Sequence, residues 1–211
     1  MDRSSSFWNN RLHQCLLGGY LLLWAVLAVS PVDRRDWLLE NILTFLLAAV
    51  LVATYRTFQF SNASYVLIAC FMALHAIGAH YTYSQVPLGF WLKEAFDLSR
   101  NHFDRIVHFA FGLFLAYPIR EILVRRAGIR GGWSYLFAVL SVMACSGFFE
   151  VLESWVAQIV SPELGAAYLG TQGDEWDAQK DETAACVGAV LAVLLTVAAS
   201  KLLPAKLRPA H

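Results

Sequence analysis

The chain has 211 residues, of which 58% are apolar and only 15% are charged, whereas soluble domains carry about 25% charged residues. This composition excludes an ordinary water-soluble domain and predicts a membrane protein. Sixteen acidic residues balance sixteen basic ones, so the net charge gives no sign of a nucleic-acid partner. The cysteines stand far apart in apolar stretches, which excludes a disulfide framework and predicts small buried side chains. They are Cys15, Cys70, Cys145 and Cys186.

Six apolar segments are long enough to cross a membrane, which takes about 20 mostly apolar residues. Because backbone polar groups must be paired in lipid, each segment is expected to be helical. We therefore predict an all-α, polytopic transmembrane helical bundle that forms a single domain over residues 1–211. The first segment is long for a signal peptide and is interpreted as a retained span. The spans are expected near residues 12–30, 37–55, 63–81, 103–119, 133–155 and 177–203.

The segments between the spans differ in character. Residues 83–101 contain Trp91 and Phe96 and are expected to lie along the membrane interface as an amphipathic or re-entrant piece. Residues 161–173 contain glycine and proline and lead directly into a run of acids.

Lysine and arginine are distributed unevenly between the two sets of loops. Ten lie at the termini and in the second and fourth loops, including Arg3, Lys206 and Arg208, and six lie in the remaining loops. Because positive charge concentrates on the cytoplasmic side, both termini are predicted to be cytoplasmic. That arrangement requires an even number of spans, which six satisfies.

With this topology, acidic and histidine side chains from four stretches of sequence reach one membrane face. They lie where the third span ends, where the fourth begins, where the fifth ends and where the sixth begins. The residues are His75, Asp104, His108, Glu150, Glu153, Asp174, Asp177 and Asp181.

Helical spacing groups these side chains further. Asp104 and His108 are separated by four residues, and Glu150 and Glu153 by three, so each pair shares one helix face. The six carboxylates would repel one another, and a divalent cation would remove that repulsion. A mixed set of ligands suits Zn²⁺ or Mn²⁺, and a carboxylate-dominated subset suits Mg²⁺. The predicted metal ligands are Asp104, His108, Glu150, Glu153, Asp177 and Asp181, with His75 as an additional candidate.

A structural interpretation competes with this one. Asp104 and Asp174 are also suited to a helix N-terminus, where negative charge meets the helix dipole. The dipole does not explain Glu150 and Glu153, which are expected near a helix C-terminus. His75 fits a hydrogen-bonded histidine inside the bundle as well as it fits a ligand, whereas His13 is expected at the surface.

Three motifs carry a family likeness: residues 100–109 (RNHFDRIVHF), residues 150–153 (EVLE) and residues 169–181 (LGTQGDEWDAQKD). They resemble the YjdF-like family of bacterial inner-membrane proteins, whose biochemical function is unassigned. A wider similarity is to VanZ-like membrane proteins, whose Asp-Lys-x-x-His-Phe motif is matched by Asp104 to Phe109 with arginine in place of lysine. The resemblance implies a multi-pass protein of the bacterial inner (plasma) membrane with a role in the cell envelope.

Two functional hypotheses follow. The first is a metal-dependent hydrolase or transferase that acts at the outer leaflet on a lipid-linked envelope substrate, with Asp174 as general base. The second is a non-catalytic membrane protein, either a cation or proton pathway or a structural bundle with a buried polar network. A pathway needs ionisable residues throughout the membrane depth. Here they crowd at one end, which disfavours a pathway and favours an outward-facing site, and it leaves catalysis and a structural bundle both open.

Overall fold

The computed structural model of the protein describes residues 6–202, and every element in that range is a helix. This confirms the expected all-α class. Arg3, Lys206, Arg208 and the last residue of the predicted sixth span lie outside the described residues. The elements are η1 (Phe7–Asn9), α1 (Arg11–Leu27), α2 (Arg34–Thr54), α3 (Asn62–His80), α4 (Pro87–Ala95), α5 (Phe103–Arg125), α6 (Gly131–Ile159), α7 (Pro162–Leu169) and α8 (Asp177–Leu202).

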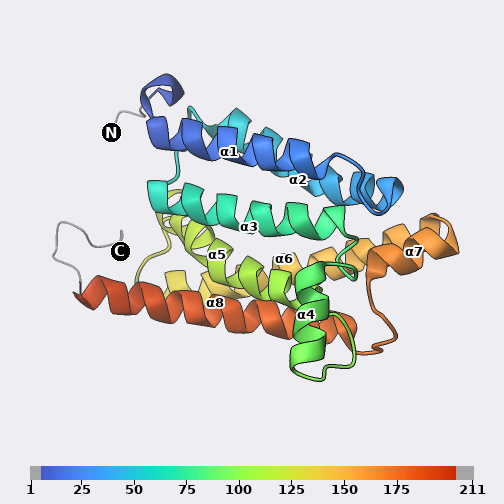
Figure 1. The fold of residues 1–211 in the computed structure, drawn as a ribbon. Coiled ribbons are helices and arrows are strands. Elements are labelled where there is room, and N and C mark those ends of the chain that lie inside the picture. The colour runs from blue at the N-terminus through green and yellow to red at the C-terminus, as the bar shows by residue number, and fades with distance from the viewer. Residues whose placement is uncertain (1–5, 203–211) are drawn as a thin grey trace.

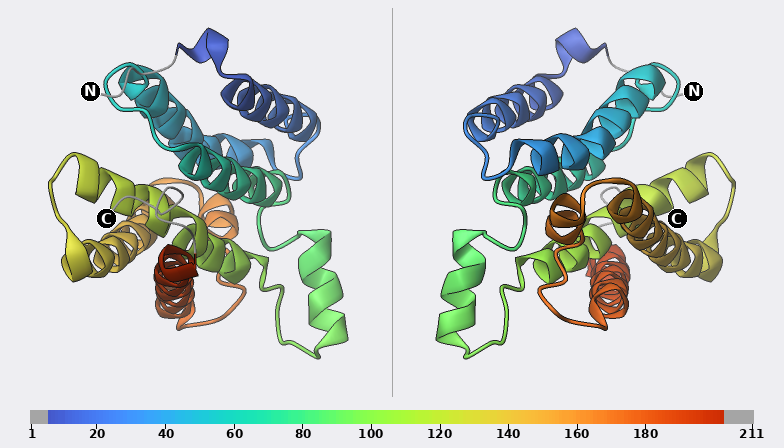
Figure 2. Two further views of the ribbon diagram at one scale, coloured as in Figure 1. Left: turned by 90° about the vertical axis from the view of Figure 1, so that its left-hand side faces the viewer. Right: turned by 90° about the vertical axis from the view of Figure 1, so that its right-hand side faces the viewer.

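The six long helices lie roughly side by side and alternate in direction (Figure 1). The start of α1 and the end of α8 lie at one end of the bundle, and α4 and α7 lie at the other, which we call the α4–α7 end. The short helix α4 stands away from the bundle (Figure 2) and exposes Trp91 and Phe96. Such a helix suits the interfacial position expected for residues 83–101.

Five helices are long and apolar enough to cross a membrane, namely α2, α3, α5, α6 and α8. The first helix is also apolar, but at 17 residues it falls short of the usual span. The count of six spans and the cytoplasmic position of the termini therefore stay predictions. Apolar residues cover the outside of the bundle, as lipid-facing surfaces require. Three cysteines, Cys15, Cys70 and Cys145, are exposed on this surface, so the expectation that they are buried is wrong.

Small residues bring α5 and α8 into close contact. A Cβ atom added at Gly112 would lie 1.9 Å from the carbonyl oxygen of Ala185, and one at Gly188 would lie 2.1 Å from the carbonyl oxygen of Phe109. In lipid, where the hydrophobic effect does not drive helices together, such close backbone approach is a main source of association. This contact determines how α5 and α8 meet at the α4–α7 end.

The opposite end of the bundle is held by separate polar contacts. Glu121 of α5 accepts a hydrogen bond from the Ser64 hydroxyl at 2.6 Å and from the Ser61 backbone N–H at 2.8 Å, where α3 begins. His13 is buried and bonds to the Tyr55 hydroxyl and the Asn62 side chain. The surface position expected for His13 is wrong, because its ring is needed to join α1 to α3.

Candidate functional site

Three side chains from α5 and α8 meet at the α4–α7 end. Asp104, His108 and Asp181 each offer one ligand atom, and these atoms all lie within 4.8 Å of one another. Two ligand atoms on one Zn²⁺ or Mg²⁺ lie at most about 4.2 Å apart. Small rotations of the carboxylates therefore suffice to close the group around a cation. We call these three residues the triad.

Ser146 of α6 determines the orientation of the His108 ring. Its hydroxyl lies 3.3 Å from Nδ1 of His108, and both residues are buried. The other ring nitrogen, Nε2, lies 3.7 Å from an Asp104 oxygen and 3.4 Å from Oε1 of Glu150. A nitrogen that faces two carboxylates needs a proton or a cation between them, and a hydrogen bond on the opposite nitrogen is typical of metal-ligating histidines.

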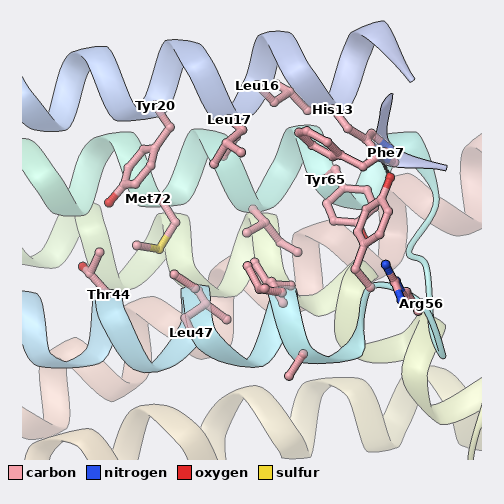
Figure 3. Close-up of a pocket in the computed structure, with 17 residues that line it drawn as sticks. Phe7, His13, Leu16, Leu17, Tyr20, Thr44, Leu47, Arg56, Tyr65 and Met72 are labelled. Carbon is pink, nitrogen blue, oxygen red and sulfur yellow. Dashed lines mark hydrogen bonds between the residues drawn. The ribbon is translucent and has the colours of Figure 1, made fainter. Parts of the chain in front are cut away.

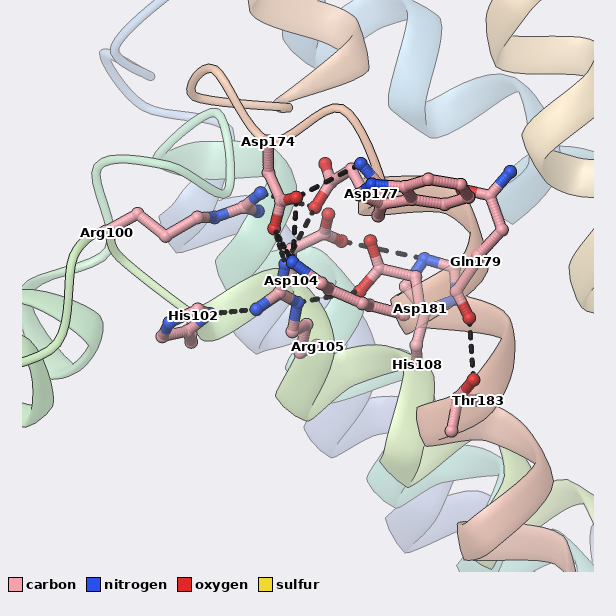
Figure 4. A network of polar contacts seen from close by, with 12 residues as sticks. Arg100, His102, Asp104, Arg105, His108, Asp174, Asp177, Gln179, Asp181 and Thr183 are labelled. Carbon is pink, nitrogen blue, oxygen red and sulfur yellow. Dashed lines mark hydrogen bonds and ion pairs between the residues drawn. The ribbon is translucent and has the colours of Figure 1, made fainter.

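Two arginines neutralise the acids next to the triad (Figure 4). Asp177 accepts a hydrogen bond from Arg100 and lies 3.3 Å from the Arg105 guanidinium. The same Arg105 also pairs with Asp174 at 2.5 Å, but its Nε is 3.8 Å from Asp181, which is too far for a hydrogen bond. Asp177 is thus engaged by arginine, whereas Asp181 keeps an oxygen without a hydrogen-bond partner among the described residues.

Asp174 lies in the turn before α8. Both of its oxygens accept hydrogen bonds from the Lys180 ammonium, at 2.7 and 2.8 Å, and one accepts from the backbone of Trp176. These bonds, with that from Arg105, hold the pKa of the Asp174 carboxyl well below its ordinary value. A carboxylate with such a low proton affinity is a poor general base at neutral pH.

The loops that carry the arginines and Asp174 are joined to each other. Gln172 donates a hydrogen bond to the carbonyl oxygen of Asn101 and accepts one from its N–H. The Asn101 side chain accepts from the N–H of Phe103 at 3.0 Å, at the start of α5, and donates to the carbonyl oxygen of Val86, next to α4. The side-chain amides of Gln172 and Asn101, one from each loop, therefore hold the start of α5 in place.

A cavity of about 510 Å³ opens beside the triad, among α2, α3, α5 and α6. Asp104 and His108 line its polar end together with Glu40, Glu153 and Tyr168. Burial, followed by the nearby Glu40 and Glu153 carboxylates, raises the pKa of Tyr168. Its hydroxyl is therefore protonated at neutral pH and can donate a hydrogen bond.

The predicted site residues fall into four groups. The triad comes together, and Glu150 lies next to it. Glu153 lines the cavity, while Asp174 and Asp177 are paired with basic residues. His75 lies apart from the triad, because its ring bonds to the Tyr83 hydroxyl at 2.5 Å and to the Glu40 carbonyl oxygen at 3.2 Å.

One helix end differs from expectation. Helix α8 begins at Asp177, as expected for the sixth span, and residues 171–176 form a turn before it in which Asp174 bonds to Trp176 and Lys180. Helix α6 continues to Ile159, so Glu150 and Glu153 lie inside it rather than at its end. The dipole argument about these two glutamates therefore has little weight.

Sequence reasoning missed two buried acids, Asp36 and Glu40, near the start of α2. Each has an oxygen without a hydrogen-bond partner within residues 6–202. Their spacing of four residues on one face of a predicted span was the signal that could have revealed them. Ser146 could not have been singled out, since a serine within a span is common.

Comparison with known proteins agrees with this architecture. Residues 12–201 match the family described as "Predicted membrane protein (DUF2238)". The chain belongs to this family. The inner membrane protein YjdF of Escherichia coli (strain K12) is similar to it, with 37% identity over 167 residues, or 79% of each chain. The expected YjdF-like membership of this DUF2238 protein is therefore confirmed.

The remaining comparisons add less. The wider similarity to VanZ-like proteins is not shown for this DUF2238 member and stays a prediction. No solved structure matches the chain. What is shown is a helical membrane protein with a relative in the bacterial inner membrane.

Proposed function

We propose that the protein binds one divalent cation, Zn²⁺, Mn²⁺ or Mg²⁺, through Asp104, His108 and Asp181 at the α4–α7 end of the bundle. The observation that carries the proposal is the orientation of His108. Its Nδ1 is held by Ser146, while its Nε2 faces the carboxylates of Asp104 and Glu150. A cation between these groups would relieve the repulsion that burial makes costly.

The local charge balance supports the same conclusion. Arg100, Arg105 and Lys180 face Asp174 and Asp177 at hydrogen-bonding distance, and only the 3.8 Å approach of Arg105 reaches the triad. The acids of the triad and Glu150 are therefore left without a close ion pair to lysine or arginine among the described residues, although Arg105 lies nearby. A buried carboxylate without a close cation is strongly disfavoured, and a divalent ion would compensate two of them.

We further propose that the bound cation serves a hydrolysis or group transfer on a lipid-linked substrate of the cell envelope. A cation of this kind polarises a substrate oxygen and lowers the pKa of water. Glu150 would accept the proton, because its Oε1 is close to the triad and has no hydrogen-bond partner in the described part of the chain. We assign this role to Glu150 rather than to Asp174, whose charge is held by Lys180 and Arg105.

The alternative of a cation or proton pathway has less support. The cavity beside the triad continues past Phe111 and Leu115, and its wall at that depth is apolar. A pathway needs polar or ionisable groups at successive depths.

Metal analysis of the purified protein tests the cation site. The wild type is expected to carry a stoichiometric divalent ion. At a concentration of one hundred times the Kd, added cation should stabilise the fold by about 2.7 kcal/mol, which raises the Tm by about 5–10 °C. Asp104→Asn and Asp181→Asn should abolish both effects, whereas Asp97→Asn in an exposed loop should keep them. Absence of bound metal together with no thermal response in the wild type would refute the proposal.

A further inference from the structure

The cavity beside the triad has two chemically different parts. Its polar end holds Glu40, Asp104 and Glu153, and the rest of its wall is built almost entirely from apolar side chains. On α5, the lining residues run from Asp104 to Ile119 along one helix face, a length of about 22 Å at 1.5 Å per residue. One leaflet of a bilayer has about 15 Å of hydrocarbon. The cavity is thus longer along α5 than the hydrocarbon depth of one leaflet.

The cavity also communicates with the lipid. Leu46 and Val50 of α2 and Phe148 of α6 line it, and each is 56% exposed on the outer surface. Helix α2 packs against α3 and α7, and α6 packs against α5, α7 and α8, so the backbones of α2 and α6 do not pack closely along their length. The exposed lining residues on these two helices indicate the side from which a lipid chain would enter the cavity.

The polar end is suited to hydrogen-bond donors. Glu40 is 3% exposed, and its Oε2 has no hydrogen-bond partner within the described range. Glu153 lines the same end, and neither glutamate belongs to the triad. A buried carboxylate oxygen without a partner is costly unless a ligand supplies a donor. Among the described residues, those that line the cavity include no lysine or arginine, so an anionic group would depend on the cation instead.

We infer that the cavity binds a zwitterionic phospholipid whose head carries N–H donors. The inference rests on the proposed function, since it names the substrate class of that site. One hydrocarbon chain lies between α2 and α5, a phosphate oxygen faces the cation of the triad, and the ammonium group faces Glu40 and Glu153. The volume of about 510 Å³ is within the usual range of ligand pockets and holds a chain with part of the head.

A second cavity provides the contrast. It has about 470 Å³ and lies between α1, α2 and α3 (Figure 3). Leu16, Leu17 and Tyr20 line it, and Thr44, Leu47 and Met72 line both cavities. Its arginine is Arg56, just after the end of α2. Within residues 6–202, no carboxylate is among its lining residues. It therefore lacks the carboxylates that would accept hydrogen bonds from a lipid head group. Substitutions in this second cavity serve as a matched control.

Photolabelling tests the inference. The wild-type protein is placed in vesicles with trace phosphatidylethanolamine that carries a diazirine in its acyl chain, and labelled peptides are mapped. Label is expected on α5 around Phe111. Leu115→Trp, which fills the cavity, should remove that label, whereas Leu16→Trp in the second cavity and Leu195→Trp on the exposed face of α8 should retain it. Equal labelling of α5 in Leu115→Trp would overturn the inference.

The head group is tested by competition. Unlabelled phosphatidylethanolamine should displace the probe about tenfold better than phosphatidylcholine, which has the same charge but no N–H donor. Glu40→Gln combined with Glu153→Gln should reduce this preference, and equal competition in the wild type would overturn the head-group assignment. Asp104→Asn should lose the cation but keep the label on α5, so failure of the cation site and failure of the lipid site give different results.

Discussion

The contact between α5 and α8 offers a sharp test of how the fold positions the site. Asp104 and His108 belong to α5 and Asp181 to α8, so the triad exists only while these helices approach closely. At Gly112 a Cβ would lie 1.9 Å from the Ala185 carbonyl oxygen, whereas ordinary contacts begin near 3.4 Å. Gly112→Ala must therefore separate the helices by about 1.5 Å.

The size of this shift predicts the outcome. The Asp181 ligand atom, now within 4.8 Å of those of Asp104 and His108, would move to about 6 Å from them, beyond the reach of one cation. Overpacking of this kind costs about 1–3 kcal/mol, which lowers the Tm by about 2–12 °C in a chain of this size. In Gly112→Ala, added Zn²⁺ or Mn²⁺ should then no longer raise the Tm, which is measured in detergent by thermal denaturation.

A matched glycine provides the control. Gly18 lies inside α1, and a Cβ there meets nothing within 4 Å. Gly18→Ala should keep or slightly raise the Tm, because alanine favours a helix by up to about 1 kcal/mol. It should also keep the response to cations. If Gly112→Ala retains both the wild-type Tm and the wild-type response, the triad does not depend on this helix contact and the reasoning is refuted.

Three further predictions concern the surroundings of the site. Ser146→Ala should weaken cation binding by about 10–100-fold, measured by titration, because His108 loses the hydrogen bond that orients it. Glu121→Ala should lower the free energy of unfolding by about 1–3 kcal/mol in denaturant melts but leave cation affinity unchanged, because it leaves the Ser61 and Ser64 donors at the opposite end without their acceptor. Lys180→Gln should raise the pKa of Asp174 toward its ordinary value. Because the folded-state pKa of Asp174 is depressed, its carboxylate stabilises the fold above about pH 4 and loses this effect as pH falls through the folded pKa; melts from pH 6 to pH 3 should show a smaller acid-dependent loss in the variant.

The helices could be predicted because each one is determined by the residues of its own segment. Runs of apolar residues with few charges identify each span without knowledge of its neighbours. The meeting of Asp104 and His108 was predictable for the same reason, since four residues make one helical turn. Their approach to Asp181 followed from a topology in which α5 and α8 both begin at the same membrane face.

Which acids pair with basic residues and which remain free to bind a cation could not be predicted in this way. Whether Asp177 or Asp181 is free to bind a cation depends on which of the two carboxylates lies closer to the Arg105 guanidinium. The loop before α8 is in turn positioned by the hydrogen bonds between Gln172 and Asn101. Glu40 enters the site from a helix far away in the sequence. Such contacts arise from tertiary packing, for which helical periodicity carries no information.

A ligand-binding cluster differs from a purely structural polar network in whether each buried polar group has a hydrogen-bond partner within the protein. In a structural network, each buried donor or acceptor finds a partner, because an unpaired group in a medium of low dielectric constant is costly. The Glu121 carboxylate at the opposite end meets that standard, with hydroxyl, backbone and arginine partners. At the α4–α7 end, oxygens of Glu40, Glu150 and Asp181 have no hydrogen-bond partner among residues 6–202. The same chain thus pairs the buried carboxylate of Glu121 and leaves oxygens of three acids at the other end without partners among the described residues, and two of these acids adjoin the large cavity.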